Sequence, residues 1–217
     1  MRRFFTLLVF GLVFASFGWT QEWQLRRFTD PAAMRETTDE LVADGFVPAS
    51  IDVSEEFGIT MLFTRLDWWT VTAYRVEEIA SLSDLTETVS GLIEEGWLPM
   101  DLSFQDDQYV LLAVDAAETL DGWRVVSSEA ELVTIQSTLS AHRSDGFQPV
   151  GISATGRTEI AYLLLGMPER DFGVPAILGV PHDPHKAAEA IQSMVDAGWY
   201  PLSITTTSEE IVVLFVD

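Results

Sequence analysis

The side chains best suited to holding a metal ion lie in one short segment, His182-Asp183-Pro184-His185. Two imidazoles and a carboxylate fall within four residues, and zinc prefers these ligands. The alternative is that Asp183 caps a helix beginning at Pro184, which would leave both histidines in solvent. Because no further ligand motif accompanies the segment, we favour the helix cap. We therefore expect no metal here, and no cofactor elsewhere.

Acidic residues are paired at three places, Glu55-Glu56, Asp106-Asp107 and Glu209-Glu210. Carboxylate pairs can hydrolyse glycosides, and acidic loops can bind calcium. However, all three pairs fall between predicted strands, where solvated acids are common. The chain also has no cysteine, no Gly-x-Ser-x-Gly elbow, no phosphate-binding glycine loop and no His-Glu-x-x-His motif. From these absences we predict that the protein is not an enzyme.

Seven tryptophans raise the hypothesis of a surface that stacks on carbohydrate. Most of them recur at equivalent places in a repeated pattern, which indicates structural roles. Trp68 departs from this pattern and neighbours Trp69, so we expect at least one of the two to be exposed. An aromatic surface patch at Trp68 and Trp69 is the predicted binding site. His142 replaces an apolar residue of that pattern, and we expect it to be partly buried.

The elements that position these residues follow a fourfold repeat. Four times, a helix-like stretch ends in glycine, an aromatic, one residue, proline, two residues and then isoleucine or leucine. The glycines are 51, 50 and 52 residues apart, a period typical of tandem structural units. The motif residues are Gly45, Pro48, Gly96, Trp97, Pro99, Gly146, Pro149, Gly198, Trp199 and Pro201.

The repeated motif indicates a helix end followed by a strand. Glycine adopts the left-handed conformation of a helix C-cap without steric cost, and proline cannot continue a helix. A further strand precedes each helix, at Trp23–Phe28, Trp69–Val76, Trp123–Ser127 and Ala176–Val180, and three of the four open with tryptophan. Two further strands follow each proline, and the second is nearly all apolar, as in a central strand. The expected fold class is α+β, with four tandem β-α-β-β repeats of about 50 residues, a largely antiparallel sheet and helices packed on one face.

The predicted boundaries follow from this period. They are a signal peptide at 1–18 and repeats at 19–66, 67–116, 117–166 and 167–217. The repeats could pair into two domains, 19–116 and 117–217, or form one continuous array, and the spacing fits both.

The unit resembles a class of short, uncharacterised bacterial domains with an opening aromatic strand, a helix ending in Glu-Gly-Trp and a closing hairpin. Glu95-Gly96-Trp97 and Ala197-Gly198-Trp199 carry the resemblance, and Asp44-Gly45-Phe46 and Asp145-Gly146-Phe147 match it loosely. The added proline departs from the usual ending. The resemblance implies a fold and no activity.

The N-terminus has the parts of a secretion signal. Arg2 and Arg3 precede the apolar segment Phe4–Phe14, and Ser16-Phe17-Gly18 offers small residues for cleavage. An uncleaved anchor is the alternative. The net charge of −22 disfavours nucleic acid and anionic lipid. We expect a secreted or periplasmic bacterial protein that is not inserted in a membrane after signal removal.

These observations predict an exported, non-enzymatic repeat protein that acts as an interaction or structural module of the cell envelope, with a protein or envelope partner. The alternative is a glycan- or peptide-binding protein that uses a groove between repeats, and the third hypothesis is an uncharacterised enzyme. The ligand and the oligomeric state stay open. Function should be sought where the copies differ, at Trp68, His142, the turn at Arg157 and the segment His182–His185.

Overall fold

The computed structural model describes residues 22–54, 58–105, 108–155, 158–207 and 209–217. The predicted signal segment 1–18, the acid pairs Glu55-Glu56 and Asp106-Asp107, and the turn at Arg157 lie outside these described residues. Among the described residues, no helix is both long and apolar enough to cross a membrane.

Each repeat contains a strand, a 13-residue helix and two more strands. The first repeat comprises β1 (Trp23–Phe28), α1 (Pro31–Ala43), β2 (Val47–Ser54) and β3 (Gly58–Thr64). The second comprises β4 (Tyr74–Ile79), α2 (Leu82–Glu94), β5 (Leu98–Gln105) and β6 (Gln108–Val114). The third comprises β7 (Gly122–Glu129), α3 (Leu132–Ser144), β8 (Phe147–Ala154) and β9 (Glu159–Gly166). The fourth comprises β10 (Ala176–Val180), α4 (Pro184–Asp196), β11 (Tyr200–Thr206) and β12 (Ile211–Val216).

The predicted fold class is wrong in its arrangement. In the described residues the strands do not form a sheet with the helices on one face, but four separate three-stranded antiparallel sheets accompanied by four short helices. In each sheet the last strand is central, as in the order β1-β3-β2. Hydrophobic periodicity identifies the strands, but it does not say which strands share a sheet. The predicted strand at Trp69–Val76 also begins later, at Tyr74, so Trp69 lies in a linker.

The repeated prolines help to keep the four sheets apart. Each of them lies on the inner edge strand of its sheet, and a β-bulge follows it, as between Pro48 and Ser50. A proline has no backbone N–H, so sheets tolerate it at their edges. The inner edges of neighbouring sheets therefore meet without a continuous backbone ladder.

The helix ends have the geometry that the repeated glycines require. Gly45, Gly96, Gly146 and Gly198 have φ values of 84°, 86°, 86° and 94°. The following amide reaches back to the helix, as where Trp97 N donates to Leu92 O at 2.8 Å. This is the hydrogen bond of a Schellman C-cap, and it turns the chain from the helix into the inner strand.

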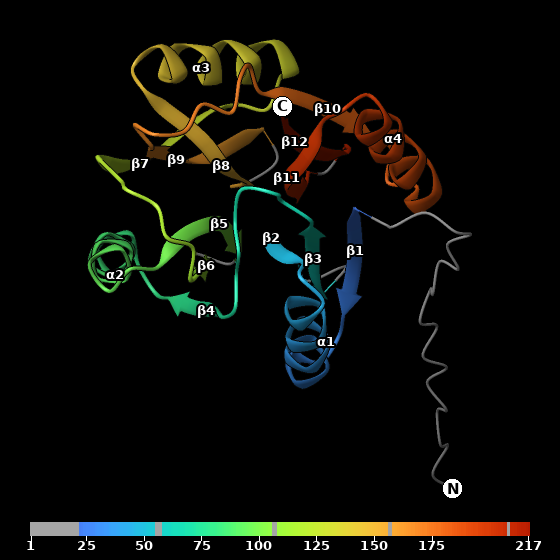
Figure 1. Ribbon diagram of the computed structural model, residues 1–217. Coiled ribbons are helices and arrows are strands. Elements are labelled where there is room, and N and C mark those ends of the chain that lie inside the picture. The colour runs from blue at the N-terminus through green and yellow to red at the C-terminus, as the bar shows by residue number, and fades with distance from the viewer. Residues whose placement is uncertain (1–21, 55–57, 106–107, 156–157, 208) are drawn as a thin grey trace, which may run out of the picture.

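The four repeats close into a ring (Figure 1). Inner strand β2 contacts β5, β5 contacts β8, β8 contacts β11, and β11 contacts β2 again. The inner strands gather in the middle of the ring and the helices lie outside them (Figure 1). Trp23 of β1 and Leu62 of β3 belong to the same hydrophobic cluster as Ile191 of α4, so the last repeat also packs against the first.

Candidate functional site

Side chains, not backbone ladders, join the inner strands around the ring. At one level Val53 N donates to Ser103 Oγ at 2.9 Å, Phe104 N to Ser153 Oγ at 2.8 Å, and Ala154 N to Thr205 Oγ1 at 2.8 Å. The fourth repeat is joined back to the first where Thr205 Oγ1 donates to Asp52 Oδ1 at 3.4 Å. Burial raises the pKa of Asp52 to about 6, against the opposing hydrogen bonds from Thr206 and Thr205.

A second level of hydrogen bonds lies beside the first, and its acceptor side chains stand two residues after a repeated proline. Ile51 N donates to Asp101 Oδ2, and Ile152 N to Ser203 Oγ, both at 2.9 Å. Ile204 N donates to Ser50 Oγ at 3.0 Å.

The remaining equivalent position is Gly151, which has no side chain. A Cβ atom there would lie 2.4 Å from Asp101 Oδ1 and 2.9 Å from Asp101 Cα. Gly151 therefore makes room for the larger acid of the preceding repeat.

Asp101 is a fully buried carboxyl group between two hydroxyls. Ser50 Oγ donates to its Oδ2, and Ser203 Oγ donates to its Oδ1 at 3.1 Å. Burial raises its pKa to about 8, against the opposing hydrogen bonds. The acid form consequently predominates at pH 7. Ser50 and Ser203 are also fully buried, so a substrate in solvent cannot reach this group of side chains.

A large hollow lies elsewhere, between the first and second repeats. This groove, which we call the repeat 1–2 groove, has a volume of about 940 Å³. Helix α1 and strands β2 and β3 line one side, and the segment 70–74, β4 and β6 line the other. Its apolar lining consists of Pro31, Met34, Val42, Ala43, Gly45, Ile51, Val53, Ile59, Val71, Ala73, Val76 and Val110.

Polar side chains line the same groove at Arg35, Asp39, Tyr74 and Glu78. Tyr74 Oη donates to the backbone oxygen of Arg35 at 3.3 Å and so joins β4 to α1. Burial raises the pKa of Tyr74, and the negative charge of Asp39 raises it further. The apolar lining with a few polar groups is the common composition of a ligand site.

Hydrogen bonds hold the wall of the groove at residues 72 and 73. Asp115 Oδ1 accepts from Thr72 N and from Ala73 N, each at 2.8 Å. Its other oxygen accepts from Thr72 Oγ1. These contacts fix the backbone that leads into β4, so this wall is organised without a ligand.

The predicted aromatic site at Trp68 and Trp69 lies where three linkers meet. Trp68 is half-buried, and its ring centroid is 4.8 Å from that of Tyr200 and 6.1 Å from that of Phe172. Trp69 is buried, and its indole N–H donates to Glu118. The two tryptophans contact each other edge to face at 6.4 Å. Neither side chain is exposed, so the expected exposure was wrong, and their role in binding stays a prediction.

The predicted metal segment begins α4. Asp183 is its N-cap and accepts from His185 N at 3.0 Å and from Lys186 N at 3.3 Å. Within the part of the chain that the structure describes, no three His, Cys, Asp or Glu side chains are grouped so that they could hold a metal ion. His142 is half-buried on α3, and its Nδ1 has no hydrogen-bond partner among the described residues.

The sequence did not single out the groove residues or Asp101. Lining residues such as Arg35 and Tyr74 come from different repeats, and no local motif joins them. The buried acid did leave a signal. Ser50, Asp101, Gly151 and Ser203 occupy one repeat position, and Asp101 is its only acid. An acid at a strand position that small residues occupy in the other repeats indicates an unusual environment.

A family model matches one segment of the chain. The family BTRD1, described as "Polyglycine hydrolase-like, structural repeat", matches residues 20–60, which hold β1, α1, β2 and the start of β3. Over this segment the chain is similar to a structural repeat, but the match does not reach Glu95-Gly96-Trp97. A search of curated proteins found no match.

This match contradicts the prediction that the protein is not an enzyme, because the family's description names a hydrolase. That prediction relied on the absence of local motifs. Catalytic groups commonly come from segments that are distant in sequence, so missing motifs are a weak argument against activity.

Proposed function

We propose that this chain is an exported interaction module that binds a peptide in the repeat 1–2 groove. The observation that carries the proposal is the groove itself, because it is of ligand size and combines an apolar lining with a few polar groups. It lies between two repeats, where the sequence placed the alternative binding site. The matched structural repeat supports a repeat module.

The composition of the groove favours a peptide with apolar side chains. Its apolar lining is aliphatic, and among the described lining residues Tyr74 is the aromatic one. A glycan site would be expected to offer several flat rings for stacking. Valine and isoleucine side chains such as Val53, Ile59 and Val76 instead match the branched side chains of an extended peptide.

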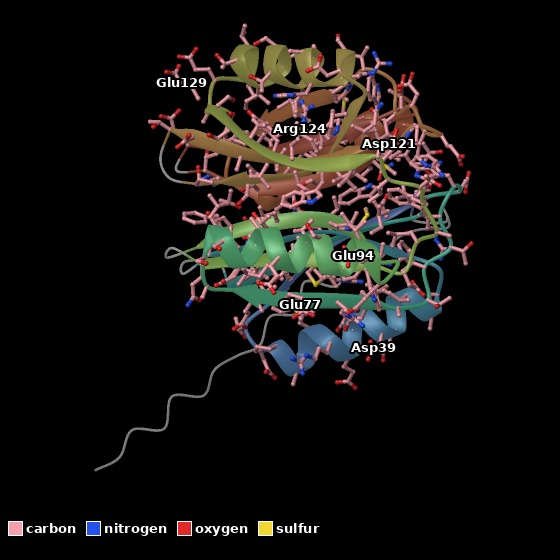
Figure 2. The ribbon with its side chains drawn as sticks, turned by 90° about the vertical axis from the view of Figure 1, so that its left-hand side faces the viewer. Asp39, Glu77, Glu94, Asp121, Arg124 and Glu129 are labelled. Atoms are coloured by element: carbon pink, nitrogen blue, oxygen red, sulfur yellow. The ribbon has the colours of Figure 1, made fainter. Side chains whose placement is uncertain are left out.

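Charge favours a peptide that also carries lysine or arginine. Asp39 and Glu78 outnumber Arg35 in the lining, and the whole chain has a net charge of −22. Figure 2 shows acids spread over one side of the molecule, at Asp39, Glu77, Glu94, Asp121 and Glu129, with Arg124 among them. Such a field attracts cationic ligands and repels anionic ones.

The export part of the proposal rests on the N-terminal sequence. Arg2, Arg3 and the apolar segment Phe4–Phe14 have the order of a secretion signal. A chain without cysteine is compatible with an oxidising compartment, because it cannot form wrong disulfides there. An exported protein would meet its partner in the cell envelope. Expression with and without residues 1–18, followed by cell fractionation, tests the export.

The binding proposal is tested by calorimetric titration of the full chain with three short peptides. One alternates valine and lysine, one valine and glutamate, and one serine and lysine. We expect the valine–lysine peptide to bind at least tenfold more tightly than either of the others. Its affinity should fall at high salt, since screening weakens exposed charge interactions.

A matched pair of variants locates the binding. Val76 and Val125 are half-buried, lie at equivalent positions of β4 and β7, and differ in that Val76 lines the groove. Val76→Asp should lower the affinity at least tenfold, whereas Val125→Asp should leave it within about twofold. Equal effects of the two substitutions, with both variants folded, would contradict the assignment.

A further inference from the structure

A second hollow lies at the C-terminal end of α3, remote in sequence from the repeat 1–2 groove. It has a volume of about 360 Å³ and is lined by Arg143, Gln148, Arg170 and Asp171, together with Gly146, Met167 and Pro168. We call it the α3 pocket. Two of the chain's 12 basic residues line it, although the chain as a whole is strongly acidic.

The two arginines of the α3 pocket have different partners. Arg170 donates from Nε at 2.8 Å and from Nη2 to Glu118, whose side chain is 6% exposed. This pair is largely withdrawn from solvent and ties two linkers together. A buried pair of this kind is costly to separate, so we assign Arg170 a structural role in the pocket wall and not a direct contact with a ligand.

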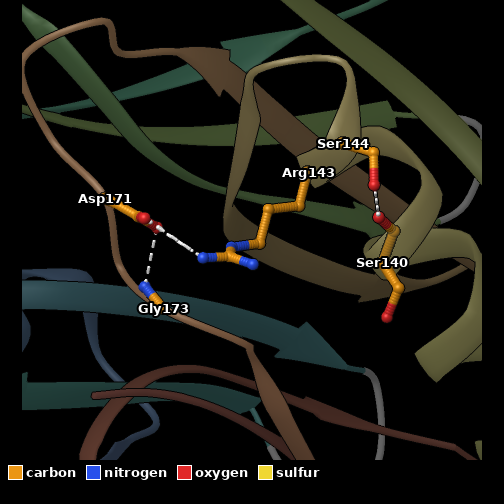
Figure 3. Close-up of polar contacts among 5 residues, drawn as sticks. All are labelled: Ser140, Arg143, Ser144, Asp171 and Gly173. Carbon is orange, nitrogen blue, oxygen red and sulfur yellow. Dashed lines mark hydrogen bonds and ion pairs between the residues drawn. The ribbon is translucent and has the colours of Figure 1, made fainter.

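Arg143 has a partner that a ligand could replace. Its Nη2 donates to both carboxylate oxygens of Asp171, at 2.9 and 3.1 Å, and it lowers the pKa of that carboxyl. Figure 3 shows Arg143 extending from the end of α3, where Ser144 and Ser140 bond within the helix, towards the loop of Asp171 and Gly173. The Asp171 side chain is 68% exposed. An exposed ion pair contributes little stability, so another carboxylate can compete for Arg143.

Two buried atoms of the lining residues lack partners. Arg143 Nε is a donor and Gln148 Oε1 is an acceptor, and neither has a hydrogen bond within the described part of the chain. Gln148 is 5% exposed and lines the pocket. A buried polar atom without a partner is destabilising, so native structures usually satisfy it with protein, water or ligand. Both residues line the α3 pocket, so a ligand that carries an acceptor and an N–H would complement the two atoms.

We propose that the α3 pocket binds a carboxylate that has a neighbouring amide N–H, as at the C-terminus of a peptide. In this arrangement the ligand carboxylate replaces that of Asp171 on Arg143, and its N–H supplies the missing donor for Gln148 Oε1. Asp171 then acts as an internal competitor that occupies Arg143 until a ligand arrives. The site and its ligand group are independent of the repeat 1–2 groove.

Three small probes test the ligand chemistry by NMR titration of the full chain. N-acetyl-alanine has both the carboxylate and the amide N–H, N-acetyl-alanine amide lacks the carboxylate, and propionate lacks the amide. We expect N-acetyl-alanine to bind at least tenfold more tightly than its amide and severalfold more tightly than propionate. Equal binding of N-acetyl-alanine and its amide would overturn the proposal.

A second set of probes separates a peptide terminus from a free small carboxylate. A tripeptide with a free C-terminus that binds more tightly than N-acetyl-alanine identifies the peptide as the source. Weaker binding of the tripeptide identifies a small N-acylated acid, which still satisfies the shared chemistry.

Two substitutions test the competition. Asp171→Asn keeps an oxygen that can accept from Gly173 N, now at 2.9 Å from Asp171 Oδ1, but it removes the competing charge. It should therefore raise the affinity for N-acetyl-alanine about two- to fivefold. Arg143→Gln should lower that affinity at least tenfold. Unchanged affinity in both folded variants would overturn the proposal.

A third substitution tests the donor–acceptor match. Gln148→Leu keeps the size of the side chain but removes Oε1, so N-acetyl-alanine should lose its advantage over propionate. If the variant does not fold, the native protein is titrated instead with N-acetyl-N-methyl-alanine, which keeps the carboxylate of N-acetyl-alanine but has no N–H. In either experiment, a retained preference for N-acetyl-alanine over the probe without an N–H would overturn the role of Gln148.

Discussion

Replacing Asp101 by asparagine should change how stability depends on pH. The carboxyl group is fully buried on β5 and its pKa in the folded chain is about 8, against an ordinary value of 3.8. Between these two values the unfolded chain releases the proton and the folded chain keeps it. Stability therefore falls as pH rises through this window and becomes level again above about pH 8.

The magnitude follows from the size of the shift. Each pH unit within the window corresponds to about 1.4 kcal/mol of unfolding free energy, and the whole window to roughly 6 kcal/mol. Asparagine does not titrate, but like the neutral acid it offers one acceptor oxygen and a donor. It can accept from Ile51 N and donate towards Ser203 Oγ, which now donates to Asp101 Oδ1 at 3.1 Å.

Urea unfolding of both proteins, followed by tryptophan fluorescence at pH 5, 6, 7 and 8, measures the effect. The unfolding free energy of Asp101→Asn minus that of the native protein should rise with pH by about 1.4 kcal/mol per unit. Asp52, whose pKa is also raised, is present in both proteins and cancels from the difference. A difference that does not change with pH would refute the reasoning.

Three further substitutions test the packing. Gly151→Ala should destabilise the ring by about 1–3 kcal/mol, because its Cβ would lie 2.4 Å from Asp101 Oδ1, and combining it with Asp101→Ser should recover only part of the loss in a double-mutant cycle, since the 2.9 Å approach to Asp101 Cα remains. Gly96→Val should cost on the order of 1 kcal/mol or more in thermal unfolding, since its φ of 86° disfavours a branched side chain; an unchanged melting temperature would contradict the cap. Glu118→Ala should cost about 3–5 kcal/mol in urea unfolding by leaving Arg170 unpaired, and a loss below about 1 kcal/mol would place that pair in solvent.

The sequence predicted the local elements better than their assembly. The Gly-aromatic-x-Pro motif located the helix ends because a left-handed cap and a residue without an N–H impose local requirements. The same prolines also separate the sheets, a consequence that depends on which strand forms the inner edge. Trp69 was misplaced in a strand because an aromatic opens the first strand in other repeats. In the second repeat that place belongs to Tyr74.

The candidate sites were beyond local patterns for a related reason. Arg35 and Tyr74 meet across two repeats, and Arg143 meets Asp171 across a linker. No single segment contains both partners, so neither contact leaves a motif. The repeat alignment nevertheless contained the position of Asp101, because equivalent residues of a closed ring face one another. Comparing copies position by position is therefore more informative than searching each copy for motifs.

The most direct test of the account is a methyl NMR titration of the full chain with the valine–lysine peptide. If the ligand lies in the repeat 1–2 groove, the methyl resonances of Val53, Val76 and Val110 should shift together with one affinity. The methyl resonances of Val125, outside the groove, should stay in place. Shifts confined to methyl groups outside the groove, or none at a saturating peptide concentration, would contradict the central claim.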